Sequence, residues 1–401
     1  MLAPIIKAMK SSEAGDGMPL FGDIRKGTFL DRPNRFVVRC LVDGLSTEAY
    51  LPNPGRLWEL LLPGCTLYLI RNHQKQSAKL PYLAVAVDKE KAPVLLHTHL
   101  INQVVAHLIS KQRIPGLEDM RIVKREVTCG HSRFDFLLEK DGRPFLLEVK
   151  SCTLFSKNLA MFPDAVTVRG KRHLTELGKL ARQGTPCGVL FLVSSPLPHF
   201  FLPDYHTDID FTRAFLALRD KLMLKAVSVH WRKDLTLRNE VRELVIPWEL
   251  IGREARDSGD YLLILNLSAD RYIPVGRLGV VFFRKGFYLY VGSARTNLRK
   301  RLERHLRRRK TLFWHIDYLR DQADACMAVP IRSSRPLEHE LAVSIKKISD
   351  WSVTKFGSSD CDCGSHLFGM HEQPLHTARF IEVLQSYRMD RLVPDLNESG
   401  T

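Results

Sequence analysis

The 401-residue sequence predicts a multi-domain protein of the α/β and β classes, in which a β-barrel precedes two α/β domains. Three observations lead to this fold class. Short apolar runs separated by turn residues fill residues 28–90, a pattern typical of a small barrel. Apolar strands alternate with helical patterns from about residue 94, and this mixture resumes after a polar, linker-like stretch at 246–260. We therefore expect domains at 20–92, 93–248 and 258–371, followed by a C-terminal tail at 372–401.

The barrel prediction depends on several short strands. The runs "RFVVRCLVDG", "CTLYLIRN" and "LPYLAVAVD" are apolar and bounded by turn residues, and their number suits a Greek-key barrel. The segment "LPNPGRLWELLLPG" interrupts them with a sharp turn and a short helical pattern that begins near Arg56.

The first α/β domain contains "RFDFLLEKDGRPFLLEVK", residues 133–150, which predicts a β-hairpin. Its Asp-Gly pair at 141–142 indicates a two-residue type I′ turn, because both positions need a positive φ. Counting back from this turn places Asp135 directly opposite Glu148, with Cβ atoms about 5 Å apart. Lys150 shares the face of Glu148, because side chains alternate along a strand.

This face is a candidate metal site. Two carboxylates so close repel each other in a partly dry environment unless a cation bridges them. A hard ion such as Mg²⁺ or Mn²⁺ takes carboxylate ligands. The alternative is a solvated hairpin that simply carries charges, but Leu137 and Leu146 place apolar residues on the same face. Glu126, one strand earlier, is equally well explained as a third metal ligand or as a surface charge.

The charge of the chain is strongly positive. The chain has 60 Lys and Arg residues and 44 Asp and Glu residues, which gives a net charge of +16 and a pI near 9.5. This charge predicts a polyanionic partner. The sequence favours DNA, or RNA, over a membrane because it shows no lipid anchor and no membrane-spanning run. Eight scattered cysteines and the absence of a signal-like apolar core near the N-terminus predict reduced thiols and a cytoplasmic protein.

Half of the excess charge lies in "RTNLRKRLERHLRRRK", residues 295–310. Leu298, Leu302 and Leu306 recur every four residues, which predicts a helix with one buried stripe and a basic exterior. A solvated basic face is the alternative, but such density without acidic neighbours favours contact with phosphate.

The first 248 residues resemble the sugar fermentation stimulation protein family. The motifs "RPNRF", "LPNPGRLWELLLPG", "SRFDF", "FLLEVKSCTL", "MFPDAVTVRGKRHLTEL" and "GVLFLV" occur in the family's order and spacing. The resemblance implies an OB-like β-barrel and a PD-(D/E)XK nuclease-like core. We expect the cytoplasm of a bacterium or archaeon as the location, with association with the nucleoid as one option. Asp135 matches the lone acid of the nuclease motif, and Glu148 and Lys150 match its E-x-K.

The resemblance also implies roles for these residues. Asp135 and Glu148 would hold Mg²⁺, and Lys150 would orient the attacking water and offset charge on the phosphate. The chain departs from the family at Thr167-Val168-Arg169-Gly170, where an acid is common, so a role for an acid there is absent.

Residues 259 to about 370 resemble GIY-YIG nuclease domains. "GDYLLIL" and "FYLYVGSA" stand for the two halves of the signature, with Gly292 allowing close approach of the backbone. "LRKRLERHLR", "FWHIDYL" and "LEHELA" continue the match. The resemblance implies a Tyr as general base, an Arg on the phosphate and a single Glu as metal ligand. The corresponding candidates are Tyr261, Tyr290, Arg301 and Glu338.

Two further sets of residues are candidates. A structural zinc site at Cys361, Cys363 and His366 is considered but is disfavoured against local packing, because a closed site needs a fourth ligand and the usual spacings differ. The candidate contacts to nucleic acid are Arg35, Asn53, Arg56, Arg169, Lys171, Arg299, Lys300, Arg304, His305 and Arg308.

These observations favour a cytoplasmic, metal-dependent nuclease that hydrolyses phosphodiester bonds of DNA. The rival hypothesis is a non-catalytic DNA-binding regulator of sugar metabolism, and RNA processing is a third possibility. The sequence does not separate DNA from RNA.

Overall fold

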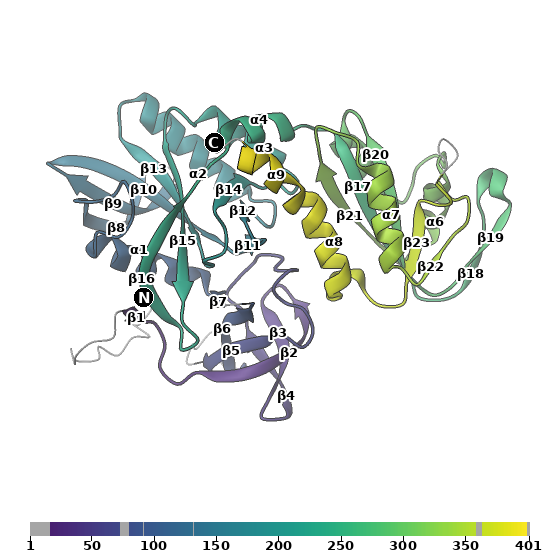
Figure 1. Ribbon diagram of the computed structural model, residues 1–401, viewed down its shortest axis with the longest axis horizontal. Helices are drawn as coiled ribbons and strands as arrows, with labels where there is room; N and C mark the ends of the chain where they lie inside the picture. Colours follow the sequence, from purple (N-terminus) through teal and green to yellow (C-terminus); the bar gives the residue numbers. More distant parts are fainter. Residues whose placement is uncertain (1–16, 73–79, 91, 131, 358–362, 399–401) are drawn as a thin grey trace. The chain divides into compact units, whose positions relative to one another are not determined.

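The computed structural model describes residues 17–72, 80–90, 92–130, 132–357 and 363–398 (Figure 1). The chain divides into two compact units. The first comprises Met1–Asp204 and Asp210–Pro247, and the second comprises Tyr205–Ile209 and Trp248–Thr401. None of the helices in these described ranges is long and apolar enough to cross a membrane.

An OB-like barrel opens the first unit, as predicted. Its six-stranded sheet has the order β4-β3-β2-β5-β6-β7, and a parallel pairing of β4 with β6 closes five of these strands into a barrel. The strands are β2 (Arg25–Asn34), β3 (Val37–Val42), β4 (Leu45–Tyr50), β5 (Thr66–Arg71), β6 (Tyr82–Lys89) and β7 (Ala92–Leu95). The expected helix near Arg56 is wrong, because the chain there forms only turns between β4 and β5.

The α/β core of the first unit is built on a seven-stranded sheet with the order β1-β16-β15-β13-β10-β9-β8. Its strands are β1 (Gly17–Pro19), β8 (Arg121–Cys129), β9 (Ser132–Lys140), β10 (Arg143–Cys152), β13 (Cys187–Val193), β15 (Met223–Trp231) and β16 (Thr236–Leu244). A three-stranded sheet is formed by β11 (Leu154–Phe155), β12 (Leu159–Phe162) and β14 (Phe200–Pro203). The helices are η2 (Thr98–Leu100), α1 (Ile101–Ser110), α2 (Val168–Arg182) and α3 (Ile209–Ala217).

Burial in this sheet follows the sequence pattern. All seven residues of β13 are buried, as the continuous apolar run of a parallel interior strand requires. Helix α1 buries Val104, Val105 and Leu108 in the same core cluster as Leu147 of β10 and Leu190 of β13. Buried packing against α1 and β13 therefore holds β9 and β10 in place.

The second unit contains a five-stranded sheet with the order β21-β17-β20-β23-β22. Its strands are β17 (Gly259–Leu267), β20 (Gly286–Ala294), β21 (Ala325–Arg332), β22 (Trp351–Ser352) and β23 (Leu367–Met370), and β18 (Arg271–Pro274) and β19 (Val280–Phe283) form a separate ribbon. The helices are α4 (Trp248–Glu254), η3 (Gly276–Leu278), α5 (Leu298–Leu306), α6 (His315–Gln322), α7 (Glu338–Ile348), η4 (Pro374–His376), α8 (Ala378–Arg388), η5 (Asp390–Leu392) and α9 (Val393–Glu398).

The predicted C-terminal tail at 372–401 is wrong, and the linker at 246–260 contains α4. Helix α8 buries Phe380, Ile381 and Leu384, and it contacts α7 in the second unit. The hydroxyls of Ser344 and Tyr387 lie 2.9 Å apart across these two helices. Phe380, Ile381, Leu384 and Tyr387 recur at the i, i+1, i+4 and i+7 spacing of an amphipathic helix, a pattern that the expectation of a tail overlooked.

The basic helix α5 differs from its prediction at one position. Leu298 and Leu302 are buried, but Leu306 is 39 % exposed and His305 is buried in its place. Positions 298, 302 and 305 fit the 3.6-residue period, whereas a strict four-residue spacing drifts around the helix.

Candidate active sites

The hairpin that carries the first candidate site has the predicted turn and register. Asp141 and Gly142 have φ values of 51° and 73°, as a type I′ turn requires. The ladder pairs Arg143 with Lys140 and continues in the same register to Leu147 with Phe136. The next positions along the two strands are Asp135 and Glu148, so these two acids are neighbours.

Asp135 is anchored by hydrogen bonds from two directions. Asn102 Nδ2, from α1, donates to Asp135 Oδ1 at 2.6 Å, and the Val149 amide donates to Oδ2 at 2.8 Å. Burial and the nearby charge of Glu148 raise the pKa of Asp135 above its ordinary value despite these bonds. A buried acid whose charge is destabilised by a neighbouring acid is a suitable environment for a cation.

Glu148 is 3 % exposed, and its two carboxylate oxygens have different contacts. Oε1 accepts from Lys150 Nζ, and it lies 2.5 Å from His173 Nδ1 on α2. Burial raises the pKa of Glu148, but His173 and Lys150 outweigh it, and the pKa lies below its ordinary value. The other oxygen, Oε2, is buried and has no hydrogen-bond partner among the described residues. One free carboxylate oxygen beside a second acid fits a hard divalent cation.

Sequence reasoning missed Asn102 and His173. Each comes from a helix that is far from the hairpin in the sequence, and neither belongs to a local motif that predicts a contact with an acid. Glu126, considered as a further ligand, is 64 % exposed and lies 3.5 Å from Arg133 Nη1, which favours its interpretation as a surface charge.

The predicted nucleic-acid contacts of the first unit divide into two groups. Arg35, Arg169 and Lys171 are exposed, and Arg56 lies over the Trp58 ring at 4.8 Å. Asn53 is 4 % exposed, and its amide bonds to the carbonyl of Leu96 and the amide of Gly55. The assignment of Asn53 to nucleic acid is therefore wrong, because the side chain holds its own loop together.

The second candidate site is a cavity of about 530 Å³ in the second unit. The four predicted residues all line it: Tyr261 on β17, Tyr290 on β20, Arg301 on α5 and Glu338 at the start of α7. The two tyrosine rings lie 6.4 Å apart between centroids. The sequence thus identified residues that the fold brings together from four separate elements.

Gly292 lines this cavity and leaves room for the Tyr261 side chain against its backbone. A Cβ atom at this position would lie 2.5 Å from the Tyr261 hydroxyl oxygen, so any side chain would displace that ring. The same hydroxyl lies 2.9 Å from His305 Nε2. Burial, followed by the charge of Lys310, lowers the pKa of His305 to about 4, so its ring is neutral near pH 7. Burial raises the pKa of Tyr261 well above its ordinary value.

Glu338 is held at both carboxylate oxygens. Ser293 Oγ donates to Oε2 at 2.5 Å, and His366 Nδ1 lies 3.2 Å from Oε1. Burial raises the pKa of Glu338, but the bonds from His366 and Ser293 outweigh it and lower the pKa below its ordinary value. The carboxylate is therefore charged and oriented near neutral pH.

Two predicted nucleic-acid contacts in α5 are used within the fold instead: His305 is buried, and the partly exposed Arg304 side chain is paired with Asp317. The Arg304 guanidinium bonds to both oxygens of Asp317, at 2.9 and 3.1 Å, and lies 4.2 Å from the Trp314 ring centre. His305 is 1 % exposed. Asp317 also accepts from the amides of Phe313 and Trp314. Sequence reasoning missed Asp317, which is fully buried in a chain with excess positive charge.

Six basic residues between positions 295 and 310 do face solvent, whereas Arg301 is partly buried and the Lys310 side chain is buried beside Asp317. The six are Arg295, Arg299, Lys300, Arg307, Arg308 and Arg309. The Arg308 guanidinium bonds to the carbonyl of Asp321 at 3.2 Å but stays exposed. This exposed group, rather than the whole helix, forms the basic face.

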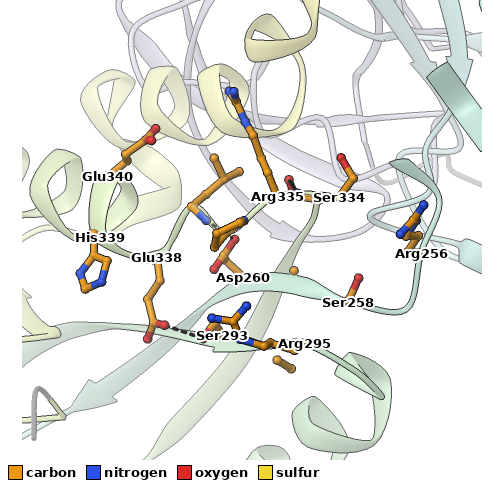
Figure 2. A pocket seen from close by; sticks show the side chains of 15 residues that line it. Arg256, Ser258, Asp260, Ser293, Arg295, Ser334, Arg335, Glu338, His339 and Glu340 are labelled. Atoms are coloured by element: carbon orange, nitrogen blue, oxygen red, sulfur yellow. Dashed lines mark hydrogen bonds between the residues drawn. The ribbon is translucent and has the colours of Figure 1, made fainter. Parts of the chain in front are cut away.

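A second pocket, of about 360 Å³, lies on the other side of Glu338 (Figure 2). Arg256, Arg295 and Arg335 line it together with Asp260, which is 1 % exposed and accepts the Leu337 amide at 3.0 Å. Burial, and to a lesser extent the charge of Glu338, raises the pKa of Asp260 to about 7.

We expect this buried acid to make the second unit less stable as the pH rises. The unfolded chain releases the Asp260 proton near pH 4, whereas the folded chain keeps it until about pH 7, so stability falls across that window. The Asp260→Asn variant keeps an acceptor for Leu337 and should be more stable than wild type at pH 8, by at most about 4 kcal/mol. Thermal unfolding at several pH values in a chelator checks this, and an equal pH slope in both proteins would contradict it.

Three family models match consecutive parts of the chain. The "SfsA N-terminal OB domain" matches residues 30–96, the "Sugar fermentation stimulation protein RE domain" residues 99–234, and the "Domain of unknown function DUF123" residues 260–389. The matched segments define a multi-domain protein in which an OB barrel and an RE domain precede a third domain.

The relatives are archaeal and bacterial. A sugar fermentation stimulation protein homolog of Methanosphaera stadtmanae is 36 % identical over 231 residues, which cover 54 % of this chain and 96 % of the relative. The Clostridium perfringens homolog is 34 % identical over 230 residues, covering 57 % and 97 %. The structure of Pyrococcus furiosus SfsA in complex with Ca²⁺ matches with a TM-score of 0.53 and 30 % identity, over 58 % of this chain and 99 % of that one. The chain belongs to the sugar fermentation stimulation protein family.

Proposed function

We propose that this protein binds nucleic acid and hydrolyses phosphodiester bonds with the help of a divalent metal ion. The observation that carries the proposal is the convergence of Asp135, Glu148 and Lys150, with one buried Glu148 oxygen left without a described partner. The similar Pyrococcus furiosus protein has been solved in complex with Ca²⁺, a cation that prefers oxygen ligands as Mg²⁺ does.

In the first site, Asp135 and Glu148 would hold Mg²⁺ or Mn²⁺. Such an ion polarises a phosphate oxygen and lowers the pKa of a bound water. The Lys150 ammonium, 17 % exposed beside Glu148, can orient that water and offset charge on the phosphate. Asn102 and His173 do not touch the substrate in this proposal, and they fix the directions of the two carboxylates.

In the second site, the resemblance to GIY-YIG domains assigns the general base to a tyrosine and the metal ligand to Glu338. His305 Nε2, 2.9 Å from the Tyr261 hydroxyl, would orient that hydroxyl in the cavity, where its deprotonated form would take a proton from water. Arg301 lines the same cavity and supplies positive charge for a phosphate. The adjoining exposed Arg299, Lys300, Arg307, Arg308 and Arg309 favour a polyanionic substrate.

The test is cleavage of plasmid DNA, single-stranded DNA and RNA by the purified full chain. We expect products with Mg²⁺ or Mn²⁺, none in a chelator, and none from the Glu148→Gln/Glu338→Gln double variant. DNA binding without cleavage under any metal would support the alternative of a non-catalytic regulator. Cleavage that persists in the double variant would rule out both proposed sites.

A further inference from the structure

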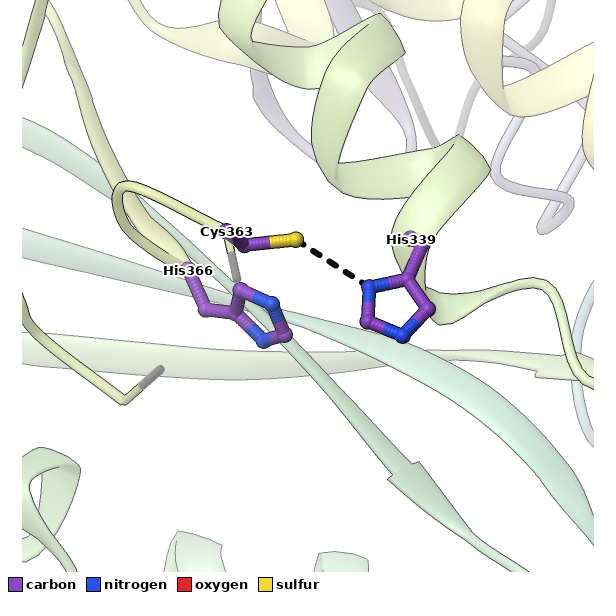
Figure 3. A group of neighbouring side chains, drawn as sticks. All are labelled: His339, Cys363 and His366. Carbon is purple, nitrogen blue, oxygen red and sulfur yellow. Dashed lines mark hydrogen bonds between the residues drawn. The ribbon is translucent and has the colours of Figure 1, made fainter. Parts of the chain in front are cut away.

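Three metal-ligating side chains meet beside the second site (Figure 3). His339 is the second residue of α7, whereas Cys363 and His366 lie in the segment that leads into β23. One ligand atom from each lies within 4.8 Å of the other two, and His339 Nδ1 is 3.1 Å from Cys363 Sγ. Two of these residues were predicted as zinc ligands, but His339 was not. The third predicted ligand, Cys361, lies outside the described residues.

The distances are close to those of a bound ion. Zinc binds sulfur at about 2.3 Å and nitrogen at about 2.0 Å, so two ligand atoms on one tetrahedral ion lie about 3.5 Å apart. Atoms within 4.8 Å of one another reach this separation by small rotations of the side chains. A thiolate with two imidazoles selects a transition metal such as Zn²⁺ over Mg²⁺, which prefers oxygen.

The orientation of His366 adds an independent argument. Its Nδ1 lies 3.2 Å from Glu338 Oε1, and Figure 3 shows the other edge of the ring facing Cys363. Histidines that bind zinc commonly donate their second ring nitrogen to a carboxylate, which fixes the tautomer and the ring direction. Glu338 stands in that relation to His366, which is 2 % exposed and therefore held in place.

We propose that His339, Cys363 and His366 form a binding site for Zn²⁺ or a similar transition-metal ion. The fourth position faces the cavity that His339 and His366 line together with Tyr290 and Glu338, so it is available to water or a ligand. Three protein ligands and an open position are typical of zinc sites that do chemistry rather than closed structural sites. The proposal does not rest on phosphodiester hydrolysis.

The test uses the full chain, stripped with a chelator and titrated with Co²⁺, whose absorption reports thiolate ligation and tetrahedral geometry. We expect one equivalent of Co²⁺ to bind with thiolate-to-metal absorption, Zn²⁺ to displace this equivalent, and Zn²⁺ to protect Cys363 from alkylation. Cys363→Ser and His339→Ala should each lower Zn²⁺ affinity at least about a hundredfold, and Glu338→Gln about tenfold or more. His339 is exposed, so its replacement should leave the fold intact, which circular dichroism checks.

Two matched variants serve as controls. Cys326→Ser, at another partly buried thiol of the second unit, and His371→Ala, at an exposed histidine, should leave the affinity unchanged. The proposal is overturned if the thiolate-to-Co²⁺ absorption survives Cys363→Ser, or if no tight equivalent with this absorption binds to the wild-type chain. Alkylation of Cys363 at equal rates with and without Zn²⁺ would likewise overturn it and would favour a thiol–imidazole pair without metal.

Discussion

The Glu148→Gln variant is expected to lose at least about a thousandfold of the Mg²⁺-dependent cleavage that we propose for the first unit, because metal-ion catalysis supplies several kcal/mol. The amide keeps the size of the side chain and an acceptor for Lys150, but it removes the negative charge. It leaves Asp135 as the sole acid of the pair, and one carboxylate holds a divalent ion less tightly than two. The measurement is the single-turnover cleavage rate in a Glu338→Gln background, so that the second site does not contribute.

Glu139→Gln is the matched control for this experiment. Glu139 lies on β9 of the same hairpin, but its carboxylate accepts a hydrogen bond from the exposed Arg121 side chain. The Glu139→Gln variant should therefore cleave at the wild-type rate. Far-ultraviolet circular dichroism should be unchanged in both variants. A Glu148→Gln protein that cleaves as fast as the control would contradict the assignment of this hairpin as a catalytic site.

The Asp317→Ala variant is expected to destabilise the second unit by about 3–5 kcal/mol, the usual cost of removing one partner from a buried ion pair. Asp317 is fully buried, and its carboxylate holds the Arg304 guanidinium and the Lys310 ammonium, 2.9 Å away. It also accepts two amides at the start of α6, so its loss leaves cations and amides unpaired. Urea unfolding, followed by tryptophan fluorescence, measures the change.

The stabilisation that Asp317 gives to the second unit should decrease as the pH falls. Bonds from Arg304 and Lys310 outweigh burial and lower the pKa of Asp317 to about 2. Its stabilisation is therefore complete above the ordinary aspartate pKa and is lost as the pH falls toward 2. Asp321→Asn, on the same helix but partly exposed, should change the stability little. Equal effects of the two variants would contradict the structural role given to Asp317.

The features that the sequence predicted depend on local rules. An Asp-Gly turn sets the register of a hairpin by counting, so the neighbourhood of Asp135 and Glu148 follows from residues less than 20 positions apart. The alternation of short apolar runs likewise predicted the barrel. The tyrosines of the second site were found through a resemblance, because nothing local in strands β17 and β20 distinguishes them from packing residues.

The features that the sequence did not predict depend on packing between distant segments. His173, Asn102 and His339 each meet their partners across at least 24 positions, and no periodicity encodes such a pairing. The same limit explains the wrong surface assignments in α5. Arg304 looks like its exposed neighbours in sequence, and only the buried Asp317, 13 positions away, draws it inward.

Only one Glu148 oxygen, Oε1, contacts Lys150 and His173, and this has a consequence for metal binding at the proposed site. Because the Lys150 ammonium already balances the charge of the carboxylate, the empty hairpin folds without needing a cation to neutralise it. At the proposed metal site, the ion would therefore be lost and regained while the protein stays folded, and its occupancy would follow the supply of divalent metal in the cell. A chelator should silence such a protein reversibly rather than denature it.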